Sequence, residues 1–215
     1  MGLREKKAQR NRERIVREAL ALFARHGYEQ TTMESIARAA ELSPSTLYRC
    51  FPSKDLIVLS RFKSYAEEFA RVFAACSMKR PVDEALAQAI FTTLEAEDAR
   101  ETETLLVRSI IDKAPVARAR LWDYIAEQQR QLCKLLAHRL HAKPDDLRIV
   151  LAAQTAMMIA GIAADRWRST GRKTPSRATA AELMRLIEQQ AVVFPRPPAK
   201  SVKPARRPAR PAPRK

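Results

Sequence analysis

Apolar residues recur at helical spacing along most of this 215-residue chain, and that pattern restricts the fold more than any other feature. Between residues 9 and 26, for example, Ile15, Ala19, Leu22 and Phe23 fall on one face of a helix. The chain has only four glycines, and no segment alternates apolar and polar residues as a half-buried strand does. We therefore expect an all-α protein.

Helix-start signals divide this pattern into nine predicted helices. Ser43 precedes Pro44 as a helix cap precedes a first-turn proline, and Thr174 precedes Pro175 in the same way. Thr31 and Glu34 have the spacing of a capping box. The predicted helices cover residues 9–26, 31–40, 43–50, 53–76, a segment from 82, 102–112, a segment from 116, 145–169 and 174–194.

The short helix at 44–50 has an outward face whose residues suit contact with a partner. Leu47 and Phe51 face inward by helical spacing. The outward residues are small, hydrogen-bonding, aromatic or cationic: Pro44, Ser45, Thr46, Tyr48 and Arg49. Such side chains suit the base edges and phosphates of a DNA major groove better than a protein core.

The first quarter of the chain resembles the N-terminal DNA-binding domain of the TetR family of bacterial transcriptional regulators. The resemblance is carried by Arg14-Ile15-Val16, Leu20-x-Leu22-Phe23, His26-Gly27-Tyr28, Thr31-Thr32, Ile36-Ala37, Ser43, Thr46-Leu47-Tyr48 and Phe51-x-Ser53-Lys54. It implies a helix-turn-helix on a three-helix head, a larger all-helical ligand-binding domain and a working homodimer.

The resemblance also implies which residues meet DNA. Thr46 and Tyr48 are the expected contacts, beside Pro44. Further expected contacts are Ser45 and Arg49 near base edges, Lys54 on a phosphate, and Thr32 and Ser43 on the DNA backbone. The chain departs from the family at Glu41, where a glycine is usual, and at Cys50, where Tyr or His often stands. We expect the turn at Glu41 to be strained or redrawn.

We divide the chain into three parts. Residues 1–53 form the helix-turn-helix head with a basic N-terminal arm, residues 54–194 an effector-binding and dimerisation domain, and residues 195–215 a disordered tail. The tail holds eight basic residues, no acidic one and many prolines. It either lies along DNA phosphates or only aids solubility. Arm residues Arg4, Lys6, Lys7 and Arg10 either reach a neighbouring groove or fray into solvent.

Two sets of apolar residues in the second part are candidates for further roles. Aromatic and sulfur-bearing residues that either line an effector pocket or form ordinary core are Phe69, Phe73, Phe91, Trp122 and Met157. Residues that either form a two-fold helical interface or pack internally are Met158, Gly161, Ile162, Trp167, Leu183, Leu186 and Ile187. We prefer dimerisation for the second set, because one reading head binds a half-site too weakly to regulate.

The formal net charge of +16 favours a polyanionic partner, with nucleic acid first and an anionic membrane surface second. No nucleophile-and-base pattern, Walker loop or dinucleotide fingerprint occurs, so we expect neither an enzyme nor a cofactor. His138 and His141 lack a third ligand at helical spacing, so we expect no metal site. The charged N-terminus carries no secretory signal, and the apolar run at 149–164 is shorter than a bilayer span, which predicts a soluble cytoplasmic protein.

The resulting prediction is a ligand-responsive transcriptional regulator, usually a repressor in this family, that binds a palindromic DNA operator as a homodimer. The small-molecule effector is not identified by the sequence. Two alternatives stay open: an architectural nucleoid-type protein that coats DNA without sequence choice, and a helical small-molecule-binding protein with a degenerate head.

Overall fold

The computed structural model describes residues 2–192, and these form nine helices without a strand. The basic tail expected at 195–215 lies outside the described residues. The helices are α1 (Leu3–His26), α2 (Met33–Ala39), α3 (Pro44–Cys50), α4 (Lys54–Ala75), α5 (Val82–Asp98), α6 (Glu101–Lys113), α7 (Pro115–Leu140), α8 (Leu147–Ser169) and α9 (Ser176–Glu188). The all-α prediction is confirmed.

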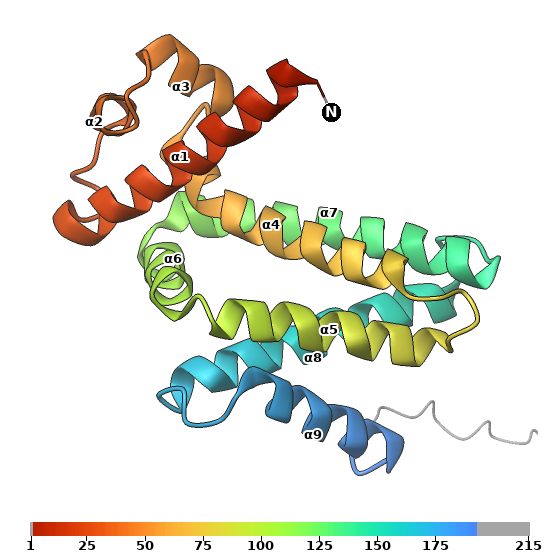
Figure 1. Ribbon diagram of the computed structural model, residues 1–215. Helices are drawn as coiled ribbons and strands as arrows, with labels where there is room; N and C mark the ends of the chain where they lie inside the picture. The colour runs from red at the N-terminus through yellow and green to blue at the C-terminus, as the bar shows by residue number, and fades with distance from the viewer. Residues whose placement is uncertain (1, 193–215) are drawn as a thin grey trace, which may run out of the picture.

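Helices α1, α2 and α3 form a head that stands above a body built from α4 to α9 (Figure 1). Helix α1 begins at Leu3, six residues earlier than the predicted start at residue 9. Its first turn is closed by Glu5, whose carboxylate accepts a 2.8 Å hydrogen bond from the Gly2 amide. The expected basic arm is therefore helical from Leu3, and Lys6, Lys7 and Arg10 lie exposed on it.

Two of the predicted helix caps differ in the structure. Helix α2 is capped by Thr32 and not by Thr31, and Thr32 exchanges hydrogen bonds with Ser35. The buried Thr31 hydroxyl instead donates to the Gly27 carbonyl at 2.8 Å, which closes the turn after α1. Helix α9 begins at Ser176, and its first amide is capped by Asp98 from the end of α5, at 2.9 Å.

Two hydrophobic clusters hold the described chain together. One lies under the head, where Leu47 and Phe51 pack with residues of α1 and α2 and continue into Val58 of α4 and Ile111 of α6. The other fills the body between α4, α5, α7, α8 and α9. The head therefore shares its core with the start of α4 and with α6, so the division at residue 53 stays a prediction about domains and is not a break in the packing.

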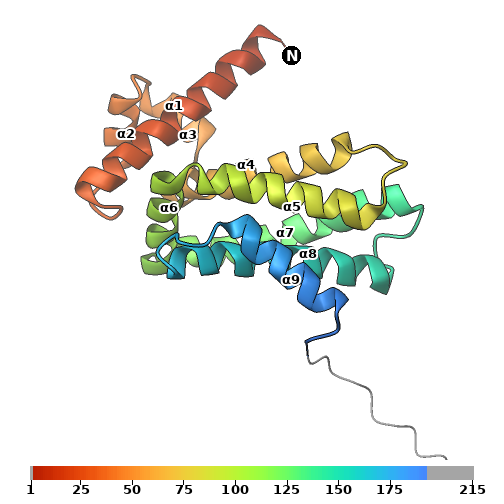
Figure 2. The same cartoon turned by 60° about the horizontal axis from the view of Figure 1, so that its bottom comes forward.

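Helix α8 is apolar on more than one side. It runs for 23 residues with a mean hydropathy of 1.7 in its most apolar window, and so it is long and apolar enough to cross a membrane. The apolar run expected from the sequence, residues 149–164, is the central part of this helix, which extends from Leu147 to Ser169. One face packs into the body, and Figure 2 shows α9 beside α8 on the side of the body away from the head.

Candidate DNA-binding surface

Helix α3 presents one polar face to solvent and anchors the other in the head. Ser43 caps it by accepting a 3.3 Å hydrogen bond from the Thr46 amide, and Pro44 occupies the first turn, where a missing N–H leaves no bond unmade. Leu47 is 0% exposed and Phe51 is 1% exposed. Solvent reaches the opposite face, where Ser43, Pro44, Ser45, Tyr48 and Arg49 are exposed and Thr46 is half-buried.

Tyr48 is held by the neighbouring helix. Its hydroxyl donates a 3.0 Å hydrogen bond to the Glu34 carboxylate on α2. This bond raises the pKa of Tyr48 and contributes to the lowered pKa of Glu34, after a larger effect of Glu34's own backbone N–H. The exposed aromatic ring of the reading face is thus fixed in direction before any DNA arrives.

The turn between α2 and α3 accommodates Glu41 by adopting a left-handed backbone. Glu41 has φ 51°, in the region that favours glycine. The Leu42 amide donates to Ala37 at 2.9 Å and the Glu41 amide to Arg38 at 3.0 Å, which is the hydrogen-bond pattern of a Schellman helix end. The turn therefore keeps the geometry that a glycine would give, with a strained glutamate in its place.

The ammonium group of Lys54, expected on a phosphate, is engaged within the protein. It donates to the backbone carbonyls of Tyr28 at 2.8 Å and Glu29 at 3.3 Å and lies 4.6 Å from the centre of the Tyr28 ring. Lys54 therefore joins the first residue of α4 to the segment after α1. Thr32, which with Ser43 was expected on the DNA backbone, is exposed at the start of α2.

Arg12 fixes the far end of α3. Its guanidinium donates to the Cys50 carbonyl at 2.9 Å and lies 4.4 Å from the centre of the Phe51 ring. The sequence analysis missed both Arg12 and Glu34 in these roles. Each contact joins residues more than a helical turn apart on different helices, so no local pattern announces it.

The five candidate effector residues do not share one environment. Phe73 is buried, and Phe69, Phe91 and Met157 are half-buried against the body cluster, with the Phe69 and Phe73 rings stacked at 6.4 Å. Trp122 was wrongly assigned to this group. It lies on the outer side of α7 and is 69% exposed, because Leu121, its buried neighbour, turns the inward face of the helix away from it.

The candidate interface residues divide in the same way. Met158 and Ile162 are 49% and 42% exposed, and Gly161 between them is exposed as well. Leu183, Leu186 and Ile187 of α9 are half-buried. Trp167, expected either at the interface or packed internally, packs internally. It is 5% exposed, because it lies one turn beyond Ala163 on the buried side of α8.

The described residues offer no obvious place for a metal, since no group of three His, Cys, Asp or Glu side chains among them is arranged to hold one. What the head does offer is a rigid, exposed and partly cationic helix. Its dimensions suit insertion into a major groove.

Known proteins share this sequence pattern and this fold. Residues 15–60 match the family of bacterial regulatory proteins called tetR. The chain is 31% identical over 155 residues to the HTH-type transcriptional regulator TcmR of Streptomyces glaucescens, which covers 67% of each protein. A putative TetR-family regulator from Mesorhizobium loti has a similar structure, with a TM-score of 0.58 and 22% identity over 85% of this chain and 97% of that one. Thermus thermophilus FadR, a TetR-family repressor solved with lauroyl-CoA, gives a TM-score of 0.53 and 23% identity over 86% and 97% of the two chains.

Proposed function

This chain belongs to the tetR family of bacterial regulatory proteins and is a DNA-binding transcriptional regulator, and we propose that it responds to a ligand and represses transcription as a cytoplasmic homodimer on a palindromic operator. The observation that carries the proposal is the exposed face of α3. Tyr48 and Arg49 stand free of the head's core on a helix capped at its start and fastened by Arg12 at its end.

The reading face combines two kinds of contact. Arg49, Ser45 and Thr46 offer hydrogen bonds to base edges, and Tyr48 offers an aromatic ring and a hydroxyl. Exposed cations on the first turns of α1, Lys6, Lys7 and Arg10, supply attraction to phosphates that carries no sequence information. We place α3 in the major groove and the start of α1 over the flanking backbone.

A second copy of this chain, paired through α8, would match a symmetric operator. Leu147, Leu151, Met158 and Ile162 form an apolar stripe along the outer face of α8, and Leu147 and Leu151 are 83% and 68% exposed. Gly161 lies on the same side of the helix, and a Cβ added there would meet nothing within 4 Å. A glycine in a helix interior costs about 1 kcal/mol relative to alanine, and close approach of a partner helix would offset that cost. Two heads so paired read half-sites roughly 34 to 36 Å apart.

The effector acts from the body. Phe69, Phe91 and Met157 are only half-buried, so the edge of the body cluster between α4, α5 and α8 lies close to the surface. The FadR structure with lauroyl-CoA is of a protein with the same fold. Lauroyl-CoA is therefore the first compound to test as an effector.

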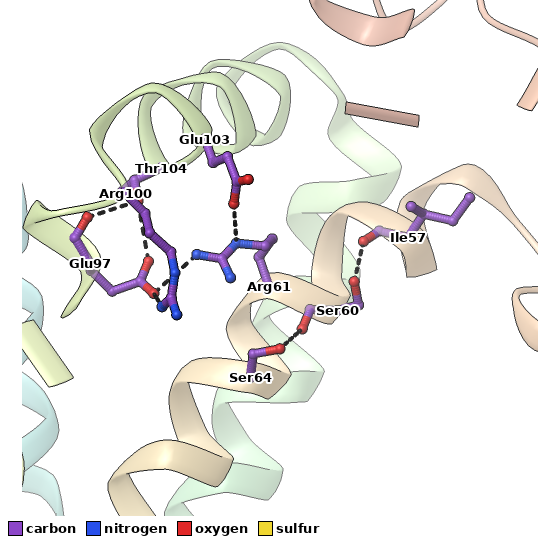
Figure 3. Close-up of polar contacts among 8 residues, drawn as sticks. All are labelled: Ile57, Ser60, Arg61, Ser64, Glu97, Arg100, Glu103 and Thr104. Atoms are coloured by element: carbon purple, nitrogen blue, oxygen red, sulfur yellow. Dashed lines mark hydrogen bonds and ion pairs between the residues drawn. The ribbon is translucent and has the colours of Figure 1, made fainter. Parts of the chain in front are cut away.

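Helix α4 is the element that transmits the effector's signal. Figure 3 shows the Arg61 guanidinium of α4 between Glu97 of α5 and Glu103 of α6, with N–O distances of 3.2 and 3.5 Å. Thr104 also donates to Glu97 at 3.2 Å. A shift of α5 or α6 therefore moves α4, whose first residue Lys54 is bonded to the head. The coupling is limited to the difference in effector affinity between the two states, typically about 1 to 3 kcal/mol.

Footprinting on genomic DNA with excess competitor tests the proposed DNA reading. We expect a protected palindrome whose protection is lost in Tyr48→Ala and weakened in Arg49→Ala. Arg71→Ala removes another exposed arginine, near the far end of α4, and serves as the matched control. Uniform coverage of all DNA would instead support an architectural protein, and specific binding that survives Tyr48→Ala would support a degenerate head.

Sedimentation tests the proposed dimer. We expect Ile162→Glu and Leu151→Glu to convert the dimer to monomer, because each buries a charge in an apolar interface. Leu140→Glu changes another exposed leucine, 46% exposed at the end of α7, and should leave the dimer intact. Equal mass for wild type and all three variants would contradict the interface.

A further inference from the structure

A hollow of about 600 Å³ lies where the head meets the body. Its walls come from Arg12 in the first half of α1, the end of α3 with the loop behind it, the first half of α4 and the first half of α7. Figure 1 shows how these elements come together, with α4 leaving the head beneath α1 and running on beside α7. The volume lies within the range of small-molecule sites.

The inner wall of this junction hollow is apolar and has one unused polar group. Phe51 and Leu59, 1% and 6% exposed, line it together with Leu56. The hydroxyl of Tyr124 is buried on the same wall and finds no hydrogen-bond partner within residues 2–192. Burial raises the pKa of Tyr124, so the hydroxyl keeps its proton and is a donor at neutral pH. A buried donor without an acceptor is costly and uncommon in folded proteins.

The rim of the junction hollow is cationic. Arg12, Lys63 and Arg120 line it, against one lining carboxylate from Asp123 and a second carboxylate, Glu67, whose charge reaches Tyr124. Two of these cations are held in place: Arg12 by the Cys50 carbonyl at 2.9 Å, and Arg120 by an ion pair with Asp55 at 2.8 Å. Lys63 is exposed and pairs only loosely with Glu67 at 3.5 Å, so its ammonium is available to a ligand.

We propose that the junction hollow binds a small amphipathic organic anion. Its apolar part lies on Phe51, Leu56 and Leu59, and its carboxylate faces Lys63. The Tyr124 hydroxyl, which is buried from solvent in the free protein, turns toward the hollow and donates to the carboxylate. The site is separate from the body cluster expected to take the effector, since it shares no residue with that cluster. A molecule bound here touches the head and α4 at once. Binding itself does not depend on the proposed function, whereas any effect on operator affinity rests on it.

Calorimetry with 2-naphthoate and decanoate tests binding on the full chain without DNA. We expect Tyr124→Phe to weaken binding at least about tenfold, since a hydrogen bond to a charged group is lost. Tyr124→Phe removes only a hydroxyl that has no partner, so its thermal midpoint should match or exceed that of wild type. Lys63→Glu should also weaken binding, and Lys134→Glu, an exposed lysine on α7 outside the hollow, should not. Neutral 2-naphthamide should bind more weakly than 2-naphthoate.

Alkylation with iodoacetamide, followed residue by residue by mass spectrometry, locates the site. Cys50 lines the junction hollow and Cys76 a different hollow at the other end of α4, and both are half-buried free thiols. We expect 2-naphthoate to slow alkylation of Cys50 and to leave Cys76 unchanged.

Three results would overturn the proposal: no binding of either acid at millimolar concentration, affinity unaltered by both Tyr124→Phe and Lys63→Glu, or protection of Cys76 in place of Cys50. None of these measurements involves DNA. A failed footprint with intact protection of Cys50 would therefore remove the proposed function alone, and the reverse pattern would remove this site alone.

Discussion

The Tyr48 hydroxyl donates a 3.0 Å hydrogen bond to the Glu34 carboxylate, and this bond joins the exposed faces of the two helices of the helix-turn-helix. The pair places a negative charge beside the aromatic ring that we assign to DNA. An acceptor on α2 thus fixes the ring's direction on α3, and the phosphate backbone meets a reading face that is not uniformly cationic.

Tyr48→Phe should raise the pKa of Glu34. The pKa is lowered first by the hydrogen bond from the residue's own backbone N–H and then by the Tyr48 hydroxyl, so removing the hydroxyl should move it only part of the way to its ordinary value. A carboxyl group whose pKa is lowered in the native state stabilises that state when the pH is above the ordinary pKa. This stabilisation is lost as the pH falls through the lowered pKa. Carbon-detected NMR titration of wild type and Tyr48→Phe measures the pKa of Glu34. Glu127, whose pKa is lowered by Gln131 and Arg130 on α7, is the internal control and should not move.

Replacing Glu41 should rank variants by their tolerance of positive φ. Glu41→Gly should raise the free energy of unfolding by up to about 1 kcal/mol, and Glu41→Val should lower it by about 1 to 2 kcal/mol. The accompanying loss of the 3.4 Å ion pair with Arg14 should matter little, because the Glu41 side chain is 83% exposed. Urea unfolding measures all three effects, with Arg14→Ala as the control for the ion pair. A more stable Glu41→Val would contradict the left-handed turn.

The Arg61 and Glu97 pair should show strong coupling. Their side chains are 12% and 20% exposed, so removing one partner leaves a largely buried charge that only a more exposed residue still offsets: Glu103 for Arg61, or Arg100 for Glu97. We expect Arg61→Met to cost about 3 kcal/mol and the double variant Arg61→Met, Glu97→Met to cost less than the two single changes together. Urea unfolding of wild type, the two single variants and the double variant completes this double-mutant cycle. Additive costs would show that the two charges do not depend on each other.

Tyr28 should make the protein sensitive to alkali. Burial, and then the charges of Asp55 and Glu29, raise the pKa of Tyr28 from 10.0 to about 12. Between these values the unfolded chain releases the proton before the native state does, so native stability falls as pH rises. Tyr28→Phe cannot release a proton and should reduce this fall. Urea midpoints from pH 8 to 12 for the two proteins test it, and parallel curves across that range would contradict it.

Local chemistry on the chain was enough to predict the reading helix. Ser43 and Pro44 announce the start of α3, and the spacing of Leu47 and Phe51 identifies its inner face. These signals act within one or two helical turns, which is the distance over which caps and periodicity operate. The all-α architecture follows from the same signals repeated along the chain.

Contacts between distant segments could not be predicted from the sequence. Asp98 caps α9 through Ser176, which lies 78 residues away, so Thr174 looked like the cap when only neighbours were considered. Trp167 could not be placed because α8 is apolar on several sides, and periodicity then cannot say which stripe the body covers. Trp122 was misplaced because an aromatic residue beside a buried leucine looks like core until the helix direction is known.

The hydrogen bonds from Lys54 to the carbonyls of Tyr28 and Glu29 fasten the first residue of α4 to the segment that follows α1. Helix α4 cannot tilt at its head end without dragging the segment after α1, and α2 begins only a few residues farther on. We therefore expect a displacement of α4 to reach the DNA-binding helices partly through these two hydrogen bonds. Lys54→Met removes both hydrogen bonds, and we expect the body then to turn while the DNA-binding helices stay where they are.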